Sequence, residues 1–139
     1  MRRIVLDTNV LVAAGRSNRG ASFRLLAMVG PEAGFGLTVS VPLVLEYEMA
    51  LKRETELIDR DVEAIVDYLC ENADRRPIYF LWRPFLRDPS DEMVLEVAVG
   101  GEAEMIVTHN IKDFAEVEER FGIRVVRPGE FLAELKEAK

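Results

Sequence analysis

Short apolar segments alternate along the chain with longer segments whose apolar residues recur every three or four positions. The short segments are apolar on both faces, which is typical of buried strands in a parallel sheet. The first of them, RRIVLD, ends its apolar run on an acid, and a helical pattern begins directly after it. Strands are predicted in this way at residues 2–7, 36–41, 77–82, 104–109 and 123–128.

The segments between the strands predict helices. Residues 59–73 show the pattern well, because their apolar side chains at 62, 65, 66, 69 and 70 form one stripe. Pro42 favours a helix start, and Gly30 and Gly122 favour helix ends. Helices are predicted at residues 8–16, 21–29, 42–53, 59–73, 88–101 and 129–139, with a loop and a short helix at 110–122. The alternation predicts an α/β fold: a three-layer α/β/α sandwich around a central, mainly parallel five-stranded sheet.

The composition favours a single domain over residues 1–139, with 49% hydrophobic and 31% charged residues around one core. No apolar run approaches the roughly 20 residues of a spanning helix, and no signal peptide is recognisable, so no membrane partner is expected. The lone Cys70 excludes an internal disulfide and favours a cytoplasmic location. A net charge of −7 argues against a general nucleic-acid coat. It leaves a nuclease open, because bound cations would offset the acids of such a site.

Several common chemistries of α/β proteins lack their motifs here. The phosphate loop GxxxxGK with Ser or Thr, the dinucleotide motif GxGxxG and the nucleophile motif GxSxG are all absent. Cys70 and His109 are each the only residue of their type, so a zinc site of nitrogen and sulfur ligands is excluded. A phosphatase or receiver domain would need a second acid two residues after Asp7, where the chain has Asn9.

Acidic and amide side chains gather where strands end and helices begin. Asp7 ends the first predicted strand, Glu46 lies in the helix after the second, and Asp91 opens the helix after the third. Asn110 and Asp113 follow the fourth strand. These positions fall on one edge of a parallel sheet, where open α/β proteins place their sites. Crowded carboxylates repel one another unless a cation lies between them, and hard divalent ions prefer oxygen ligands. Mg²⁺ or Mn²⁺ is therefore expected.

Each acid also has a purely structural interpretation. Asp7 stands where it would cap the next helix, and Asp88 with Asp91 fits a helix start, as N-cap and capping-box partner. Glu46 alone is compatible with a solvated helix position. Glu48 lies about 200° around the helix from it, so only one of these two side chains can face a site.

Three segments of the chain resemble the PIN domain family, in its VapC-like branch of toxins from toxin–antitoxin pairs. They are IVLDTNVLVAA, SVPLVLEYEMALKR and RDPSDEMVLEVAVGGEAEMIVTHNIKDF, and the match runs in order from residue 4 to about residue 131. The resemblance implies a metal-dependent endoribonuclease that hydrolyses RNA phosphodiester bonds with Mg²⁺ or Mn²⁺. RNA and an antitoxin protein are the implied partners, and a homodimer is left open.

The resemblance also implies roles for individual residues. Asp7, Glu46 and Asp91 match catalytic acids that bind the metal. Asn110 stands where the family has a fourth acid. Its carbonyl oxygen can coordinate a metal but brings no charge, which leaves open whether one or two ions bind. The implied supporting residues are Thr8, Asn9, Thr108, Asp88 and Asp113.

The sequence leaves two further functions open. A structure-specific DNA nuclease would use the same pocket, although 139 residues leave little room for clamp segments. A PIN scaffold would bind RNA or a protein without cleavage, its site weakened by Asn110.

Arg16 and Arg19 belong to an arginine-rich stretch over residues 1–30 and are predicted to contact substrate phosphates. The sequence leaves three roles open for His109: contact with the substrate, packing within the fold, or a position on the surface.

Overall fold

Five parallel strands form the centre of the molecule. The structure is a computed structural model that describes residues 2–75, 86 and 88–137. The strands pair in the order β3-β2-β1-β4-β5, and every pair in the sheet is parallel. They are β1 (Arg2–Leu6), β2 (Phe35–Val39), β3 (Ala73–Arg75), β4 (Met105–Val107) and β5 (Arg124–Val126).

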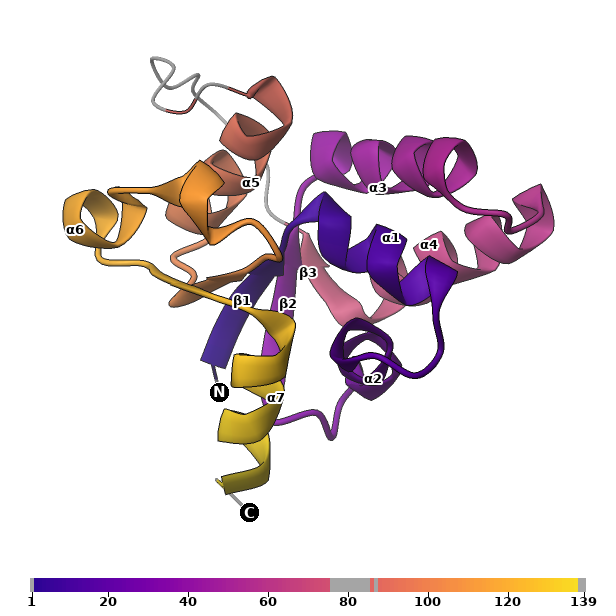
Figure 1. The fold of residues 1–139 in the computed structure, drawn as a ribbon, viewed down its shortest axis with the longest axis horizontal. Coiled ribbons are helices and arrows are strands. Elements are labelled where there is room, and N and C mark those ends of the chain that lie inside the picture. Colours follow the sequence, from indigo (N-terminus) through magenta and orange to yellow (C-terminus); the bar gives the residue numbers. More distant parts are fainter. Residues whose placement is uncertain (1, 76–85, 87, 138–139) are drawn as a thin grey trace.

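Helices cover both faces of this sheet, which confirms the predicted three-layer sandwich. Figure 1 shows α5 and α6 to one side of the strands and α1 to α4 to the other. This division follows from the right-handed crossovers that parallel strands adopt. No helix in the described part of the chain is long and apolar enough to cross a membrane. The helices are α1 (Thr8–Arg16), α2 (Ala21–Met28), α3 (Val41–Glu54), α4 (Asp59–Asn72), α5 (Pro89–Gly100), α6 (Val117–Phe121) and α7 (Pro128–Glu137), with a 3₁₀ turn η1 at Ile111–Phe114.

The described part of the third strand begins earlier than predicted. The chain leaves α4 at Asn72 and pairs with β2 at once through β3, whereas the apolar pattern extended the helix to residue 73. The predicted strand at 77–82 lies outside the described residues. β3 is a three-residue strand at the sheet edge, and Asp74 and Arg75 within it are exposed. An exposed edge strand carries no apolar run, so the rule for buried parallel strands could not detect it.

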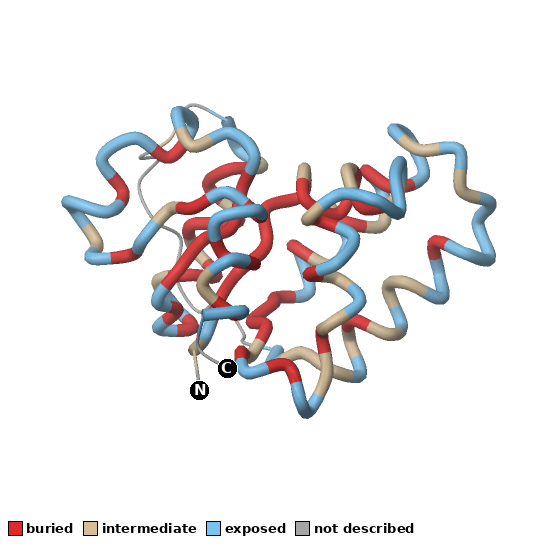
Figure 2. Tube along the Cα trace, turned by 60° about the horizontal axis from the view of Figure 1, so that its bottom comes forward, coloured by how far each residue is buried: buried red, intermediate tan, exposed pale blue. Residues whose placement is uncertain are grey.

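The core is built from the two central strands and the helices packed on them. Ile4, Val5, Ile106 and Val107 are fully buried, and Figure 2 shows buried positions concentrated along the centre of the trace. Phe131 of α7 packs edge-to-face on Phe35 of β2, with ring centroids 5.3 Å apart. This contact seats the last helix against the sheet.

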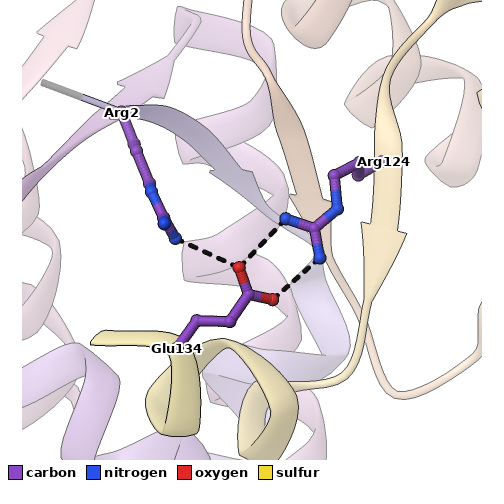
Figure 3. A network of polar contacts seen from close by, with 3 residues as sticks. All are labelled: Arg2, Arg124 and Glu134. Carbon is purple, nitrogen blue, oxygen red and sulfur yellow. Dashed lines mark hydrogen bonds and ion pairs between the residues drawn. The ribbon is translucent and has the colours of Figure 1, made fainter. Parts of the chain in front are cut away.

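A polar network holds the opposite end of the sheet from the strand ends that carry acids. Glu134 of α7 accepts two hydrogen bonds from Arg124, at 3.0 and 2.8 Å, and a third from Arg2 at 3.2 Å (Figure 3). Arg2 and Arg124 each begin a strand, so they lie at the amino edge of the parallel sheet. Arg2, although part of the arginine-rich stretch over residues 1–30, therefore lies at the edge of the sheet opposite the acids.

Strand order creates a crevice at the carboxyl edge. From β1 the chain connects outward to β2, whereas β4 lies on the other side of β1. Adjacent connections that depart in opposite directions leave an opening above the carboxyl ends of the two strands, and ligands of open α/β sheets bind there. In this protein the opening lies over the ends of β1 and β4.

Candidate active site

Asp7 lies at the centre of this crevice, one residue after the end of β1. Its side chain is only 4% exposed, and each of its carboxylate oxygens accepts a hydrogen bond. The Thr8 amide donates to Oδ1 at 2.8 Å, and the Thr108 hydroxyl donates to Oδ2 at 2.7 Å. The first bond caps α1, so Asp7 has its structural role and remains available for chemistry.

Thr108 connects the polar groups that follow β4 with those that follow β1. Besides donating to Asp7, its Oγ1 accepts hydrogen bonds from the Asn9 side-chain amide at 3.3 Å and from the Asn110 backbone amide at 3.0 Å. Asn9 in turn accepts from the His109 backbone amide at 3.2 Å. The loop after β4 is thereby fixed to the start of α1, with Asp7 between them.

A cavity of about 340 Å³ opens beside Asp7. Glu46 comes to it from α3, Asp91 from α5, and Asn110 from the loop after β4. A second cavity of about 460 Å³ shares three carboxylates with the first and extends to Lys112. The predicted residues that line the first cavity are Asp7, Thr8, Asn9, Arg16, Glu46, Asp88, Asp91, Asn110 and Asp113.

On α3 it is Glu46, rather than Glu48, that faces the cavity. The Ser90 hydroxyl donates to Glu46 Oε1 at 3.4 Å, whereas Glu48 pairs with Lys52 at 3.5 Å on the outer surface. Between the two acids, Tyr47 is fully buried and its hydroxyl donates to the Leu6 carbonyl at the end of β1. This hydrogen bond fixes the rotation of α3 about its axis, and with it the side on which Glu46 emerges.

The buried carboxylates disfavour one another's charge. The pKa of Asp7 is raised to about 6, chiefly by burial and also by the charges of Asp113 and Asp88, while the hydrogen bonds from Thr108 and Thr8 oppose the shift. Burial raises the pKa of Asp91 to about 7, and the charge of Asp7 is the next cause. Asp91 is only 8% exposed. Such a cluster attracts a cation, because the cation would offset both the cost of the buried charges and the repulsion between them.

A model of the PIN domain family matches residues 3–112, which is most of the chain and includes Asp7, Glu46, Asp91 and Asn110. The chain belongs to the PIN domain family. PIN domains are generally nucleases, and they generally use divalent metals. Among solved structures, the fold is similar to a chain in the crystal structure of VapBC2 from Rickettsia felis bound to a DNA fragment from their promoter. That likeness has a TM-score of 0.59 at 12% identity and covers 90% of this chain and 98% of the other. A comparison with curated proteins found no match.

Two observations bear on whether this PIN domain fits a divalent ion. In the part of the chain that the structure describes, no three acid, His or Cys side chains are arranged to hold one metal ion. Mg²⁺, however, keeps several waters and needs only one or two carboxylates, so a three-acid cage is not required. Thr8 Oγ1 is buried beside Asp7 and has no hydrogen-bond partner in the described structure. The oxygen-rich donor set and this unpaired hydroxyl fit a hydrated hard cation.

Some residues that line the cavity were missed by sequence analysis, and one predicted residue lies outside its described lining. Ser90, Arg53 and Glu54 also line the cavity. Arg53 was detectable, because it follows Glu46 by seven residues, close to two helical turns. Arg19 was predicted to bind substrate beside Arg16. It is exposed and does not belong to the described lining of the cavity, since α1 ends at Arg16 and the chain turns away.

His109 has a packing role in the structure. Its Nε2 lies 2.7 Å from the hydroxyl of Ser22, which is buried in α2. Burial lowers the pKa of His109, and the nearby charge of Arg127 lowers it further. A neutral imidazole bonded to Ser22 ties α2 to the loop that carries Asn110, which agrees with the packing alternative.

Proposed function

We propose that this PIN domain is a metal-dependent endoribonuclease that hydrolyses RNA phosphodiester bonds with Mg²⁺ or Mn²⁺, as the toxin of a toxin–antitoxin pair. One observation carries the proposal: Asp7 and Asp91 are buried together in one cavity, and the pKa of each carboxyl is raised. A pair of this kind is costly for the fold unless it serves a ligand.

Asp7, Asp91, Glu46 and Asn110 are the proposed metal ligands, with Asn110 contributing a neutral carbonyl oxygen. When bound, the metal polarises a phosphate oxygen and lowers the pKa of a coordinated water. Thr108 and the Thr8 amide hold the Asp7 carboxylate in one orientation, and Ser90 does the same for Glu46. Second partners of this kind orient ligands and raise metal affinity.

Hydrolysis then proceeds by in-line attack of water on the scissile phosphorus. The water oxygen bonds to phosphorus, the bond to the 3′ oxygen breaks, and the products are a 5′-phosphate and a 3′-hydroxyl. Glu46 or Asp91 accepts the proton of the attacking water. Both side chains line the cavity beside Asp7, where such a water would lie.

The proposal of a toxin rests on the resemblance of the motifs to VapC-like proteins, supported by the likeness in fold to a chain of VapBC2. If the chain is such a toxin, a small antitoxin gene lies beside its own gene. Purified antitoxin is expected to form a stable complex with this chain and to suppress cleavage. Failure of every neighbouring small protein to bind would contradict the toxin role and leave the nuclease role standing.

The decisive experiment is cleavage of RNA by the purified protein with Mn²⁺ or Mg²⁺. We expect wild type to cleave single-stranded RNA, and Asp7→Asn to lose the activity by orders of magnitude. Cleavage of structured DNA but not of RNA would favour the DNA nuclease alternative. RNA binding without cleavage under every metal condition would favour a scaffold, for which the missing charge at Asn110 is the specific argument.

A further inference from the structure

Two arginines share the cavity with the carboxylates. Arg16 from α1 and Arg53 from α3 both line it, together with Asp7 and Glu46. Each arginine lies on the same helical face as an acid-site residue. Arg16 follows Asn9 by seven positions, and Arg53 follows Glu46 by seven, so each arginine is close to two helical turns from that residue. Each helix therefore presents site residues near its start and a guanidinium near its end.

The arginines lie some distance from the acids along the cavity. With a rise of about 1.5 Å per residue, Arg16 is about 12 Å along α1 from Thr8, and Arg53 about 10 Å along α3 from Glu46. Both helices start at the carboxyl edge of the sheet and end away from it. A group held between the acids is thus separated from the arginine ends of the two helices by about 10–12 Å along the helix axes, which leaves room for a neighbouring phosphate of the same strand.

Glu54 orients both guanidinium groups. Its backbone carbonyl accepts a hydrogen bond from Arg16 Nε at 2.8 Å, and its carboxylate Oε2 accepts one from Arg53 Nη2 at 2.8 Å. Within the described residues, no ion pair joins Arg16 to a carboxylate, although acids dominate the cavity. A guanidinium has five N–H donors, and Arg16 uses one of them here.

The remaining donors suit an anion with several acceptor oxygens. Arg53 and Glu54 are exposed, and an ion pair of this kind contributes little to folding stability. The pair therefore does not account for two arginines at the end of an acidic cavity. Guanidinium groups bind phosphate through paired, charge-assisted hydrogen bonds, which are stronger and more directional than those of an ammonium group.

We propose that Arg16 and Arg53, held by Glu54, form a binding site for one backbone phosphate of the substrate, outside the phosphate that is cut. The inference rests on the proposed nuclease function and adds to it a positioning role for Arg53. It predicts that the strand lies along the groove between α1 and α3. The scissile phosphate lies at Asp7, and a neighbouring phosphate lies at the arginines.

The test compares wild type with R16Q, R53Q and the double variant, using R60Q as the matched control. Arg60 is exposed on α4 and is not among the described residues lining this cavity. The substrates are a fluorescent single-stranded RNA of twelve nucleotides and a dinucleotide that has only the scissile phosphate. For the long RNA the double variant should raise KM about tenfold, the size of a lost charged hydrogen bond. Its kcat should stay within about twofold of wild type. For the dinucleotide, wild type and variant should have equal KM values.

Binding without cleavage gives an independent readout. Fluorescence anisotropy in EDTA yields the dependence of RNA affinity on salt concentration. Its logarithmic slope should fall by about 0.7 in R16Q/R53Q, the amount expected for one single-strand phosphate contact. R16K/R53K keeps the charges and should keep the slope while losing affinity, because lysine cannot form the paired bonds. R60Q should match wild type in both.

A neutral methylphosphonate, placed at one linkage at a time, locates the phosphate. At one linkage near the scissile bond, this change should weaken wild-type binding as much as R16Q/R53Q does, and it should weaken the double variant no further. The phosphate site would be overturned if R16Q/R53Q and R60Q had the same KM for the long RNA, the same salt dependence of binding and the same response to each methylphosphonate. That result would leave the nuclease proposal intact. Arginine-dependent RNA binding without cleavage would support the phosphate site and contradict the nuclease proposal. A wild type that neither binds nor cleaves RNA would overturn both.

Discussion

The Thr108 hydroxyl donates a hydrogen bond of 2.7 Å to Asp7 Oδ2, across 101 positions of sequence. This bond joins the carboxyl ends of β1 and β4, the two strands on either side of the crevice. The Thr108 hydroxyl oxygen also accepts hydrogen bonds from the Asn9 side-chain amide and the Asn110 backbone amide. Thr108 is fully buried, so none of these bonds can be replaced by bulk water without opening the site.

Thr108→Val keeps the shape of the side chain and removes its hydrogen bonds. We expect the free energy of unfolding to fall by about 1–3 kcal/mol, because Asp7 loses a donor and two amides lose their acceptor. Metal affinity should fall about 10- to 100-fold. Chemical denaturation and metal titration measure the two effects.

Thr38→Val is the matched control for this change. Thr38 is also a buried threonine, but its hydroxyl has no hydrogen-bond partner in the described structure. Replacing an unpaired buried hydroxyl by a methyl group should leave stability unchanged or raise it. Equal losses in the two valine variants would mean that the Thr108 network contributes nothing beyond packing.

Asp7→Asn separates the capping role of Asp7 from its charge. Asparagine caps helices as well as aspartate, so α1 should keep its start. Without metal at pH 8, the variant should be more stable than wild type, because the cost of a buried charge is removed. RNA cleavage with Mn²⁺ should fall by orders of magnitude. Glu48→Gln removes an acid from the outer face of the neighbouring helix and should change neither property. A destabilised Asp7→Asn with unchanged cleavage would identify Asp7 as a helix cap only.

The metal-free protein should lose stability as pH rises from about 4 to about 7. The pKa of Asp7 is about 6 in the folded state and has an ordinary value of 3.8, so the folded state binds more protons in this window. The free energy of unfolding therefore falls with pH, by an amount on the order of 3 kcal/mol for Asp7 alone. Asp91, with a pKa of about 7, acts in the same direction. Denaturation of wild type and Asp7→Asn at pH 5 and pH 8 isolates the effect. Parallel pH profiles would contradict the raised pKa.

Mn²⁺ should raise the melting temperature at pH 8, because an ion that binds only the folded state stabilises it by mass action. The increase should be smaller at pH 5, where protons compete for Asp7 and Asp91. Asn110→Asp should enlarge the increase in melting temperature, because it adds a charged ligand for the ion. Differential scanning fluorimetry across millimolar Mn²⁺ provides the measurement. A melting temperature that does not respond to the ion in wild type or in Asn110→Asp would contradict a metal site.

The sequence predicted those features that repeat a regular geometry. Glu46 and Asp91 could be placed at one edge because parallel strands all end there, and helical rotation showed that Glu46 and Glu48 cannot share a face. Helical rotation alone could not choose between these two acids, and the choice of Glu46 came from the family resemblance. In the structure the choice depends on the hydrogen bond from Tyr47 to Leu6, between residues 41 positions apart.

Other features had weaker signals. The start of β3 at Ala73–Arg75 was missed because these exposed edge residues lack the apolar run of a buried strand. Charge alone grouped Arg19 with Arg16, but the end of α1 separates them. Arg2 was part of the same charged stretch, yet it pairs with Glu134 at the far edge of the sheet. The density of arginines along the sequence therefore suggested a phosphate ligand, but it did not indicate which arginines lie at the cavity.

The bond between Asp7 and Thr108 also sets an order of events during synthesis. A ribosome adds about 5–20 residues per second, so roughly 5–20 s separate the addition of these two residues. A nascent chain that has completed β1, α1 and α3 carries Asp7 and Glu46 but not yet Thr108, Asn110 or Asp113. During that interval its candidate catalytic centre is incomplete, and the cell contains a nuclease scaffold that cannot yet cut.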